Sequence, residues 1–175
     1  MTRTQIGVVA GMAAAFIITV ILFAFGPALA PDLVSQPSLA QRQLLAVMAG
    51  IPPLLSLTAA IGWVANARFF SPEDIDGAGL TLEGPSLRVP RAILANTAEQ
   101  VLLALPLYAG LALTLPASQL ALPPLLGGVF VLGRGLFAIG YARGAAARSF
   151  GFALTFYPSV GALIVLVMRL APIAA

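Results

Sequence analysis

Two ionisable side chains, Glu99 and Arg134, stand within stretches of sequence that are otherwise apolar. A charge at the centre of a bilayer costs on the order of 2.5–3.5 kcal/mol on insertion scales, so such residues usually face a protein interior or a cavity. At about 1.5 Å per helical residue, Glu99 lies ~16 Å beyond Arg88, and Arg134 lies ~13 Å before Arg143. The two charges therefore fall at similar depth on neighbouring antiparallel helices, and we expect an ion pair between them.

Other polar residues share helical faces with these charges. Asn96 lies three residues before Glu99, and Arg88 lies eleven residues before it, about 20° away in helical phase. On the next helix, Arg134, Tyr141 and Arg148 are spaced by seven residues, with Phe137 between them, which predicts a second stripe. Two facing stripes predict a cleft lined by Arg88, Asn96, Glu99, Arg134, Tyr141 and Arg148.

Each of these residues also has a purely structural interpretation. Arg148 fits a positively charged anchor at a helix end, and Tyr141 fits an interfacial aromatic side chain. Asn96 and Glu99 fit hydrogen bonding between helices. Because two buried charges are costly for such a role, we prefer the cleft for Glu99 and Arg134. The interpretation of Arg148 remains open at this point.

The residue types that are missing restrict the chemistry. The chain has no Cys and no His, and all nine of its basic residues are Arg. This composition excludes disulfides, thiolate metal sites, a Cys nucleophile, a His general base and a Schiff-base lysine. We therefore expect no metal site, and any reactive group should come from a bound cofactor or co-substrate. The net charge of +3 reflects arginines at helix ends and predicts no nucleic-acid partner.

Composition predicts an all-α integral membrane protein. Hydrophobic residues make up 60% of the 175 positions, charged residues make up 9%, and the mean hydropathy is +1.01. Soluble domains carry about 25% charged residues, and a membrane span needs about 20 apolar residues. Five apolar stretches meet this length and nearly exhaust the chain, at residues 6–30, 44–67, 89–115, 122–147 and 150–170. We expect one membrane domain, with a polar loop at residues 68–86 and a bend at Pro52–Pro53.

The first span also fits a signal peptide, because Ala28-Leu29-Ala30 resembles a cleavage site. The apolar stretch is long for that purpose, so we favour a retained helix. Gly7, Gly11 and Ala15 form a stripe of small residues at four-residue spacing. Such a stripe suits close helix packing but is also common on lipid-facing surfaces.

The distribution of arginines between the two sides predicts the orientation of the chain in the membrane. With five spans, the N-terminus shares a side with the second-to-third and fourth-to-fifth loops. That side collects Arg3, Arg68, Arg88, Arg91, Arg143 and Arg148, whereas the other side has Arg42 and Arg169. The positive-inside rule therefore predicts a cytoplasmic N-terminus and an external C-terminus.

Two motifs on consecutive predicted helices resemble the MAPEG superfamily, the membrane-associated proteins in eicosanoid and glutathione metabolism. The first is Asn96-Thr97-Ala98-Glu99-Gln100, and the second runs from Arg134 through Gly140-Tyr141-Ala142-Arg143 to Arg148. The loop that begins at Arg68 also resembles bacterial members, and the resemblance covers about residues 42–170. The chain departs from the family pattern at Ala92, where an Arg is usual, and at Phe137, where eicosanoid-pathway members have Tyr.

The resemblance implies a MAPEG-like four-helix bundle at residues 41–175, with residues 1–40 as an additional N-terminal helix and linker. It also implies a homotrimer in the bacterial inner membrane and a cleft that binds glutathione as co-substrate. Carried over by position, the glutathione-binding residues are Asn96, Glu99, Arg134 and Tyr141, and Arg148 is the catalytic arginine that activates the thiol. Arg88, from the predicted polar stripe, joins the binding set.

Three functions follow as hypotheses. The first is a glutathione-dependent transferase or peroxidase that acts on lipophilic electrophiles arriving through the membrane lipid. The second is a non-catalytic scaffold or accessory subunit that binds lipid. The third is a small transporter with Glu99 as a proton site, which is less favoured because the spans show no obvious internal repeat.

Overall fold

The chain folds into five long helices in a computed structural model that describes residues 1–30, 33, 35–77 and 84–171. The helices are α1 (Arg3–Phe25), α2 (Leu39–Phe69), α3 (Pro85–Thr114), α4 (Leu122–Tyr141) and α5 (Ala145–Leu170), with short 3₁₀ turns at η1 (Gly26–Leu29) and η2 (Ala117–Gln119). Each long helix is long and apolar enough to cross a membrane, and the described residues contain no strand. The prediction of an all-α integral membrane protein is confirmed.

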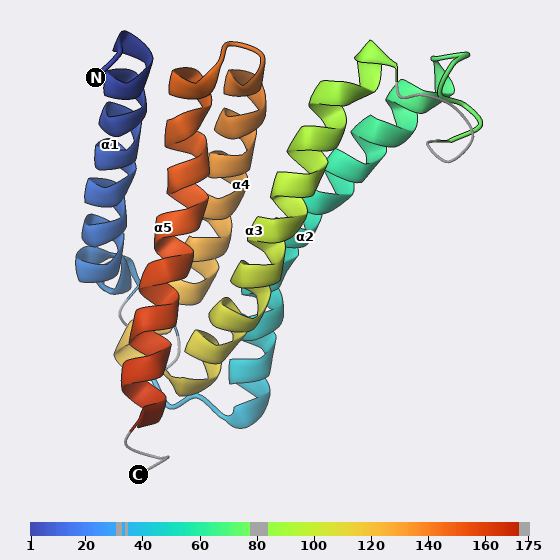
Figure 1. The fold of residues 1–175 in the computed structure, drawn as a ribbon. Coiled ribbons are helices and arrows are strands. Elements are labelled where there is room, and N and C mark those ends of the chain that lie inside the picture. Colours follow the sequence, from blue (N-terminus) through green and yellow to red (C-terminus); the bar gives the residue numbers. More distant parts are fainter. Residues whose placement is uncertain (31–32, 34, 78–83, 172–175) are drawn as a thin grey trace.

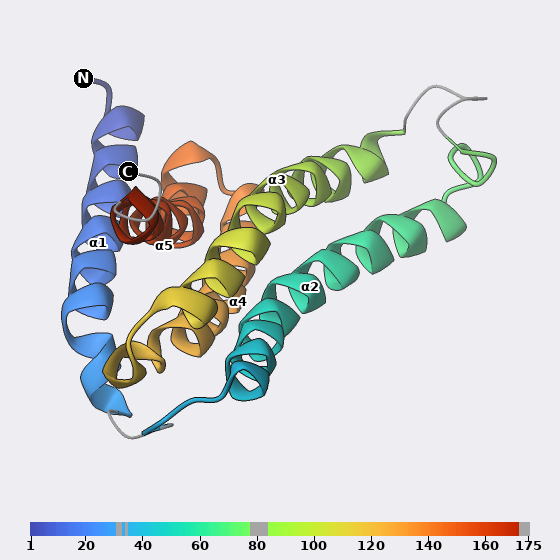
Figure 2. The same ribbon diagram turned by 90° about the horizontal axis from the view of Figure 1, so that it is seen from below.

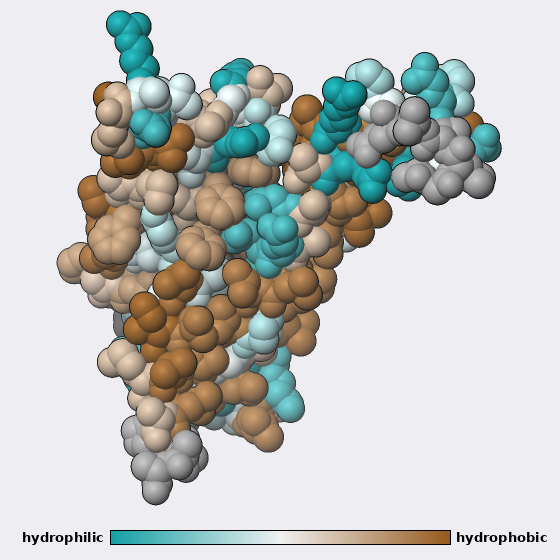
Figure 3. Space-filling model, in the orientation of Figure 1, coloured by the Kyte–Doolittle hydropathy of each residue, from teal (hydrophilic) through white to brown (hydrophobic). Residues whose placement is uncertain are grey.

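The outer surface of the bundle is hydrophobic along most of its length. Large apolar side chains such as Ile17, Leu102 and Leu132 are exposed on three different helices, as expected for contact with lipid acyl chains. Figure 3 shows brown hydrophobic surface over the helices and teal hydrophilic surface near the N-terminal end and the α2–α3 end. A separate hydrophilic patch interrupts the hydrophobic surface at mid-length, beside α3.

The helices pack as two groups that diverge toward one end. α1 lies along α5, and α4 packs on α5 from another side, whereas α2 and α3 form a hairpin that leans away from them (Figures 1 and 2). Buried Ala49, Leu111, Leu126 and Phe130 belong to the hydrophobic core where the groups converge. α2 continues as one helix through Pro52 and Pro53 and follows a curved path. A cavity lies between α3 and α5, and Asn96, Tyr141 and Arg148 of the predicted polar residues line it.

The boundary between α4 and α5 differs from the prediction. The sequence predicts a span to residue 147 and the next from residue 150, but α4 ends at Tyr141 and α5 begins at Ala145. Gly144 occupies the intervening turn with φ of +99°, a conformation that L-residues with side chains rarely adopt. Arg148 therefore lies in the first turn of α5, and the predicted single stripe of Arg134, Tyr141 and Arg148 is wrong. The tight turn instead brings Arg148 back beside Tyr141.

At the opposite end, Arg42 stabilises the C-terminus of α3. Its guanidinium donates hydrogen bonds to the carbonyl oxygens of Ala112, Leu113 and Leu115, at 3.1, 3.3 and 2.8 Å. The last carbonyls of a helix lack intrahelical partners and carry partial negative charge, so a cation is favourable there. Arg42 thus joins the start of α2 to the end of α3.

A buried carboxylate, Asp74, joins the loop after α2 to the start of α3. The Gly84 N–H donates to Asp74 Oδ1 at 2.9 Å, and the hydroxyls of Ser71 and Ser86 donate to Oδ2 at 2.8 and 3.3 Å. These hydrogen bonds, that of the Gly84 N–H above all, hold the pKa of Asp74 below its ordinary value of 3.8. The rest of the predicted polar loop, residues 78–83 with Glu83, lies outside the described residues.

Replacing Asp74 with asparagine is expected to loosen this connection in a pH-dependent way. Because the folded-state pKa is lowered, the stabilising effect of the carboxylate is complete above the unfolded-state pKa and is lost as pH falls through the folded value. The difference in thermal stability between wild type and Asp74→Asn should therefore be largest near neutral pH and should shrink below pH 3.8. Asp76→Asn, at an exposed position of the same loop, is the matched control and should behave as wild type at every pH. A difference that is constant with pH would contradict this role.

Candidate functional site

A hydrogen-bonded group centred on Asn96 links α3 to α4. Arg134 Nη1 donates to Asn96 Oδ1 at 2.9 Å, and Asn96 Nδ2 donates to Glu99 Oε2 at 3.2 Å. The expected direct ion pair between Glu99 and Arg134 is thus replaced by a connection through the Asn96 amide. Glu99 is exposed and Asn96 is half-buried, so the carboxylate stays at the surface while the guanidinium points into the bundle.

Arg134 is fixed in a buried position. Its side chain is 5% exposed, and Nη2 donates to Thr97 Oγ1 at 2.9 Å, while that hydroxyl donates to the Ile93 carbonyl at 2.7 Å. The guanidinium carbon lies 4.2 Å from the centre of the Phe137 ring, a distance at which a cation is attracted to the aromatic face. Nε has no hydrogen-bond partner among the residues that the structure describes. Arg134 does not line the cavity itself, but its hydrogen bond to Asn96 Oδ1 fixes the orientation of the Asn96 amide, which does.

Arg148 and Tyr141 form a second pair at the α4–α5 turn. The guanidinium carbon of Arg148 lies 4.4 Å from the centre of the Tyr141 ring, which in turn meets the Phe137 ring edge-on at 5.4 Å. Within the described part of the chain, the Arg148 guanidinium makes no hydrogen bond or ion pair to a side chain. Its N–H donors are therefore available to an anionic group, and the ring contact restricts its orientation.

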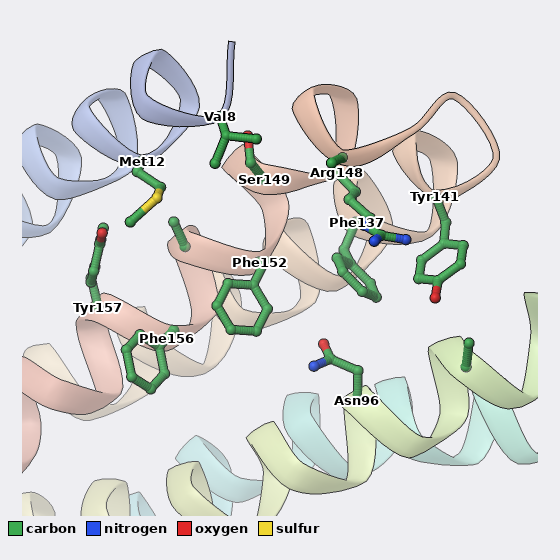
Figure 4. Close-up of a pocket in the computed structure, with 13 residues that line it drawn as sticks. Val8, Met12, Asn96, Phe137, Tyr141, Arg148, Ser149, Phe152, Phe156 and Tyr157 are labelled. Atoms are coloured by element: carbon green, nitrogen blue, oxygen red, sulfur yellow. The ribbon is translucent and has the colours of Figure 1, made fainter. Parts of the chain in front are cut away.

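These side chains face a cavity of about 480 Å³. Asn96 lines it from α3, Phe137 and Tyr141 from α4, Val8 and Met12 from α1, and Arg148, Phe152, Phe156 and Tyr157 from α5. Figure 4 shows Asn96 facing the α4 and α5 side chains across the cavity, with Arg148 beside Tyr141 and the α1 side chains above. The cavity thus has a polar end near the α4–α5 turn and a longer apolar part along α5.

Close contact between α4 and α5 sets the geometry of the polar end. A Cβ atom on Gly133 would lie 2.7 Å from Thr155 Cγ2, and one on Gly151 would lie 2.7 Å from the Gly133 carbonyl oxygen. Cβ atoms essentially never lie within 3.0 Å of a heavy atom from another part of the chain. Glycine at these positions therefore allows the two helices to approach, so that Phe137 and Tyr141 reach the α5 residues.

The structure brings some of the predicted site residues together and separates others. Asn96, Tyr141 and Arg148 line the cavity directly. Glu99 and Arg134 reach it only through Asn96, and Arg134 also borders a second cavity, of about 390 Å³, between α2, α3 and α4. Arg88 does not line either cavity; it is exposed near the start of α3, ~12 Å along the helix from Asn96.

Sequence reasoning missed two parts of the site. Thr97 holds the Arg134 guanidinium, but it stands between Asn96 and Glu99 and carries no charge to mark it. Phe152, Phe156 and Tyr157 form the apolar wall. Arg148, Phe152 and Phe156 follow one another at four-residue spacing along one helix, and this spacing was the available signal for the two phenylalanines.

The arrangement is suited to binding an anion beside an apolar group. A guanidinium with free donors, an amide and a phenol converge at one end, and no acidic side chain of the described residues lines the cavity. Groups of three or more metal-ligating side chains are absent from residues 1–30, 33, 35–77 and 84–171. The chain itself offers no strong nucleophile there, so the chemistry of the site depends on what it binds.

Comparison with known proteins gives one family match. The model of the MAPEG family matches residues 44–168, which is most of the chain and includes α3, α4 and nearly all of α2 and α5. No curated protein matches the chain, and neither does any solved structure.

Proposed function

The chain belongs to the MAPEG family, and from this membership and the cavity we propose that it is a membrane-embedded, glutathione-dependent transferase or peroxidase acting on lipophilic electrophiles. The observation that carries the proposal is Arg148, a cation that lines the cavity with its donors unused by the described residues. Such a group favours a thiolate or a carboxylate bound beside it.

The residues at the polar end fit the groups of glutathione. The tripeptide has two carboxylates, an ammonium group and a thiol. Arg148 offers paired N–H donors to an anion, and Asn96 offers an amide. Glu99 does not line the cavity, but its exposed carboxylate accepts from Asn96 Nδ2, and we propose that it pairs with the ammonium group of a tripeptide that extends beyond the cavity on the Asn96 side. When bound, glutathione supplies a thiol that bonds to the electrophilic carbon of the second substrate, as the leaving group departs with the bonding electrons and the thiol proton passes to water.

The chain's own residues prepare this chemistry by electrostatics and orientation. A free thiol has a pKa of about 8.5, and a guanidinium beside it lowers that value and so increases the thiolate fraction. Tyr141 holds the Arg148 plane through the ring contact, and Arg134 fixes Asn96 from the side opposite Glu99. Phe137, Phe152 and Phe156 exclude water from the adjoining space, which strengthens the charge interaction.

Membrane placement and assembly belong to the same proposal. Arg3, Arg68, Arg143 and Arg148 lie at the end of the bundle that carries the N-terminus, and the positive-inside rule favours a cytoplasmic location for that end. The resemblance to bacterial members supports the proposal of a bacterial inner membrane. We propose a homotrimer on the basis of family membership. The exposed apolar surface gives the second substrate a route through the bilayer.

Glutathione binding to the detergent-purified protein, measured by calorimetry, tests the proposal. Asn96→Ala should raise the dissociation constant about tenfold or more, because it removes a ligand contact and leaves a buried Arg134 donor without its partner. Glu99→Gln should weaken binding by removing the charge opposite the ammonium group. Asn66→Ala, on the exposed face at the end of α2, is the matched control and should bind as wild type.

The two outcomes separate the proposed enzyme from a scaffold. Binding that is weakened in both site variants but not in the control would support glutathione in this cavity. If wild type does not bind at millimolar glutathione, the enzyme loses its co-substrate, and a non-catalytic lipid-binding role becomes the better account.

A further inference from the structure

The first helix packs on α5 through the stripe of small residues. A Cβ on Gly7 would lie 2.8 Å from Ala146 Cβ, and one on Gly11 would lie 3.0 Å from the Phe150 nitrogen. Ala15 is fully buried and contacts the cluster of Ala153 and Leu154. This contact settles the ambiguity of the stripe: it is a helix-packing face. α1 precedes the matched residues 44–168.

This packing places two α1 side chains against the cavity. Val8 and Met12 are one residue further along than Gly7 and Gly11, so they lie at the edge of the packing stripe and border the apolar part of the cavity. In Figure 4 both point from α1 toward the α5 aromatic side chains. Phe16, one turn beyond Met12, meets the Tyr157 ring edge-on at 6.0 Å and extends the same wall.

We propose that Val8 and Met12 of α1, together with Phe152, Phe156 and Tyr157 of α5, form the compartment that binds the second substrate, an uncharged aromatic electrophile. This inference rests on the proposed glutathione-dependent function and assigns the specificity of that reaction to a helix outside the matched region. Met12 is the specificity-determining residue, because its flexible side chain sets the width of the compartment between α1 and α5.

The shape and chemistry of the compartment favour a planar, apolar ligand. Phe152 and Phe156 are stacked at 5.7 Å with their planes 20° apart, so they offer a continuous aromatic surface. Among the residues that the structure describes, Arg148 at the polar end is the only charged side chain that lines the cavity. An uncharged ring on this surface would present its reactive carbon toward the end where Arg148 lies, whereas a charged group placed beside Phe152, Phe156 and Tyr157 would find no charged partner among the cavity-lining side chains there.

Substitution of Met12 with tryptophan tests the width of the compartment. The larger side chain should lower kcat/KM for chlorodinitrobenzene about tenfold, equivalent to ~1.4 kcal/mol, because it overlaps the space for the ring. Glutathione binding by calorimetry should be unchanged, since Met12 lies in the apolar part of the cavity. Ile17→Trp, on the exposed side of the same helix, is the matched control and should retain the wild-type rate.

Photolabelling of the wild-type protein provides a test that requires no variant and no turnover. Benzophenone bound in the compartment should cross-link to the peptide that contains Met12, and excess dinitrobenzene, which lacks a leaving group, should prevent it. Labelling spread over the lipid-facing residues of α1 and insensitive to dinitrobenzene would overturn the inference. So would a Met12→Trp variant that binds glutathione and turns over at the wild-type rate. Failure of glutathione to bind would instead remove the proposed function, while competed labelling at Met12 would still support the compartment.

Discussion

Replacing Arg148 with alanine is expected to lower kcat/KM for glutathione conjugation about a hundredfold, the typical cost of removing one group that stabilises developing or resident negative charge. Arg148 lines the cavity and contacts the Tyr141 ring, and the described residues leave its donors without a partner. Its loss should therefore cost little in folding. The charge that stabilises the thiolate would be removed, so the thiol should titrate nearer its free value of about 8.5.

The pH dependence of the rate distinguishes this role from a structural one. In wild type the lowered thiol pKa should place the rise in kcat/KM below about pH 8.5, and in Arg148→Ala that rise should move toward it. Arg148→Lys keeps the charge but loses the planar fork, so it should recover part of the rate. Arg143→Ala, at an exposed position in the same turn, should match wild type. An unchanged pH profile in Arg148→Ala would leave Arg148 as a helix-end anchor.

The membrane architecture could be predicted from sequence because lipid imposes a strong composition signal. Five apolar stretches gave five helices, and their ends were placed within about five residues except at the end of α4, which was placed six residues too late. That turn depends on Gly144 with φ of +99°, and a lone Gly before Ala145, Ala146 and Ala147 resembles continuous helix. Periodicity alone could not find a break whose flanking residues all favour helix.

The sequence predicted how deep the site residues lie along the helices, but it did not predict the hydrogen bonds between their side chains. Helical rise placed Glu99 and Arg134 at similar depth, and the structure does link them. The link runs through Asn96 because the Arg134 side chain takes Thr97 as its second acceptor, a choice of rotamer that spacing does not encode. The functional roles of these residues remain predictions.

The contribution of α1 to the cavity could not be predicted from its own residues. Gly7, Gly11 and Ala15 are equally compatible with lipid and with a partner helix, because small residues are common on both kinds of surface. The partner is α5, whose Ala146 and Ser149 complete the close contact. Packing between segments that are distant in the sequence therefore decides between a lipid-facing surface and a helix-packing face for these three residues.

Substitution of Gly151 with alanine adds only one methyl group, yet we expect it to lower the free energy of unfolding more than any other substitution proposed for this protein. A Cβ there would lie 2.7 Å from the Gly133 carbonyl oxygen and 2.8 Å from the Leu136 carbonyl carbon, both backbone atoms that cannot rotate away. The helices must separate, at a cost of about 1–3 kcal/mol in the free energy of unfolding. Separation also moves Phe137 and Tyr141 relative to Arg148, so glutathione conjugation should fall together with thermal stability in detergent.

Gly135→Ala provides the matched control, because the same methyl group on α4 meets no atom within 4 Å of its Cβ. Alanine is the better helix former by about 1 kcal/mol, so this variant should be as stable as wild type or slightly more stable. The opposite signs of the two substitutions would isolate the α4–α5 contact from the general effect of replacing glycine in a helix. Equal effects at Gly151 and Gly135 would mean that the contact between α4 and α5 does not set the geometry of the polar end.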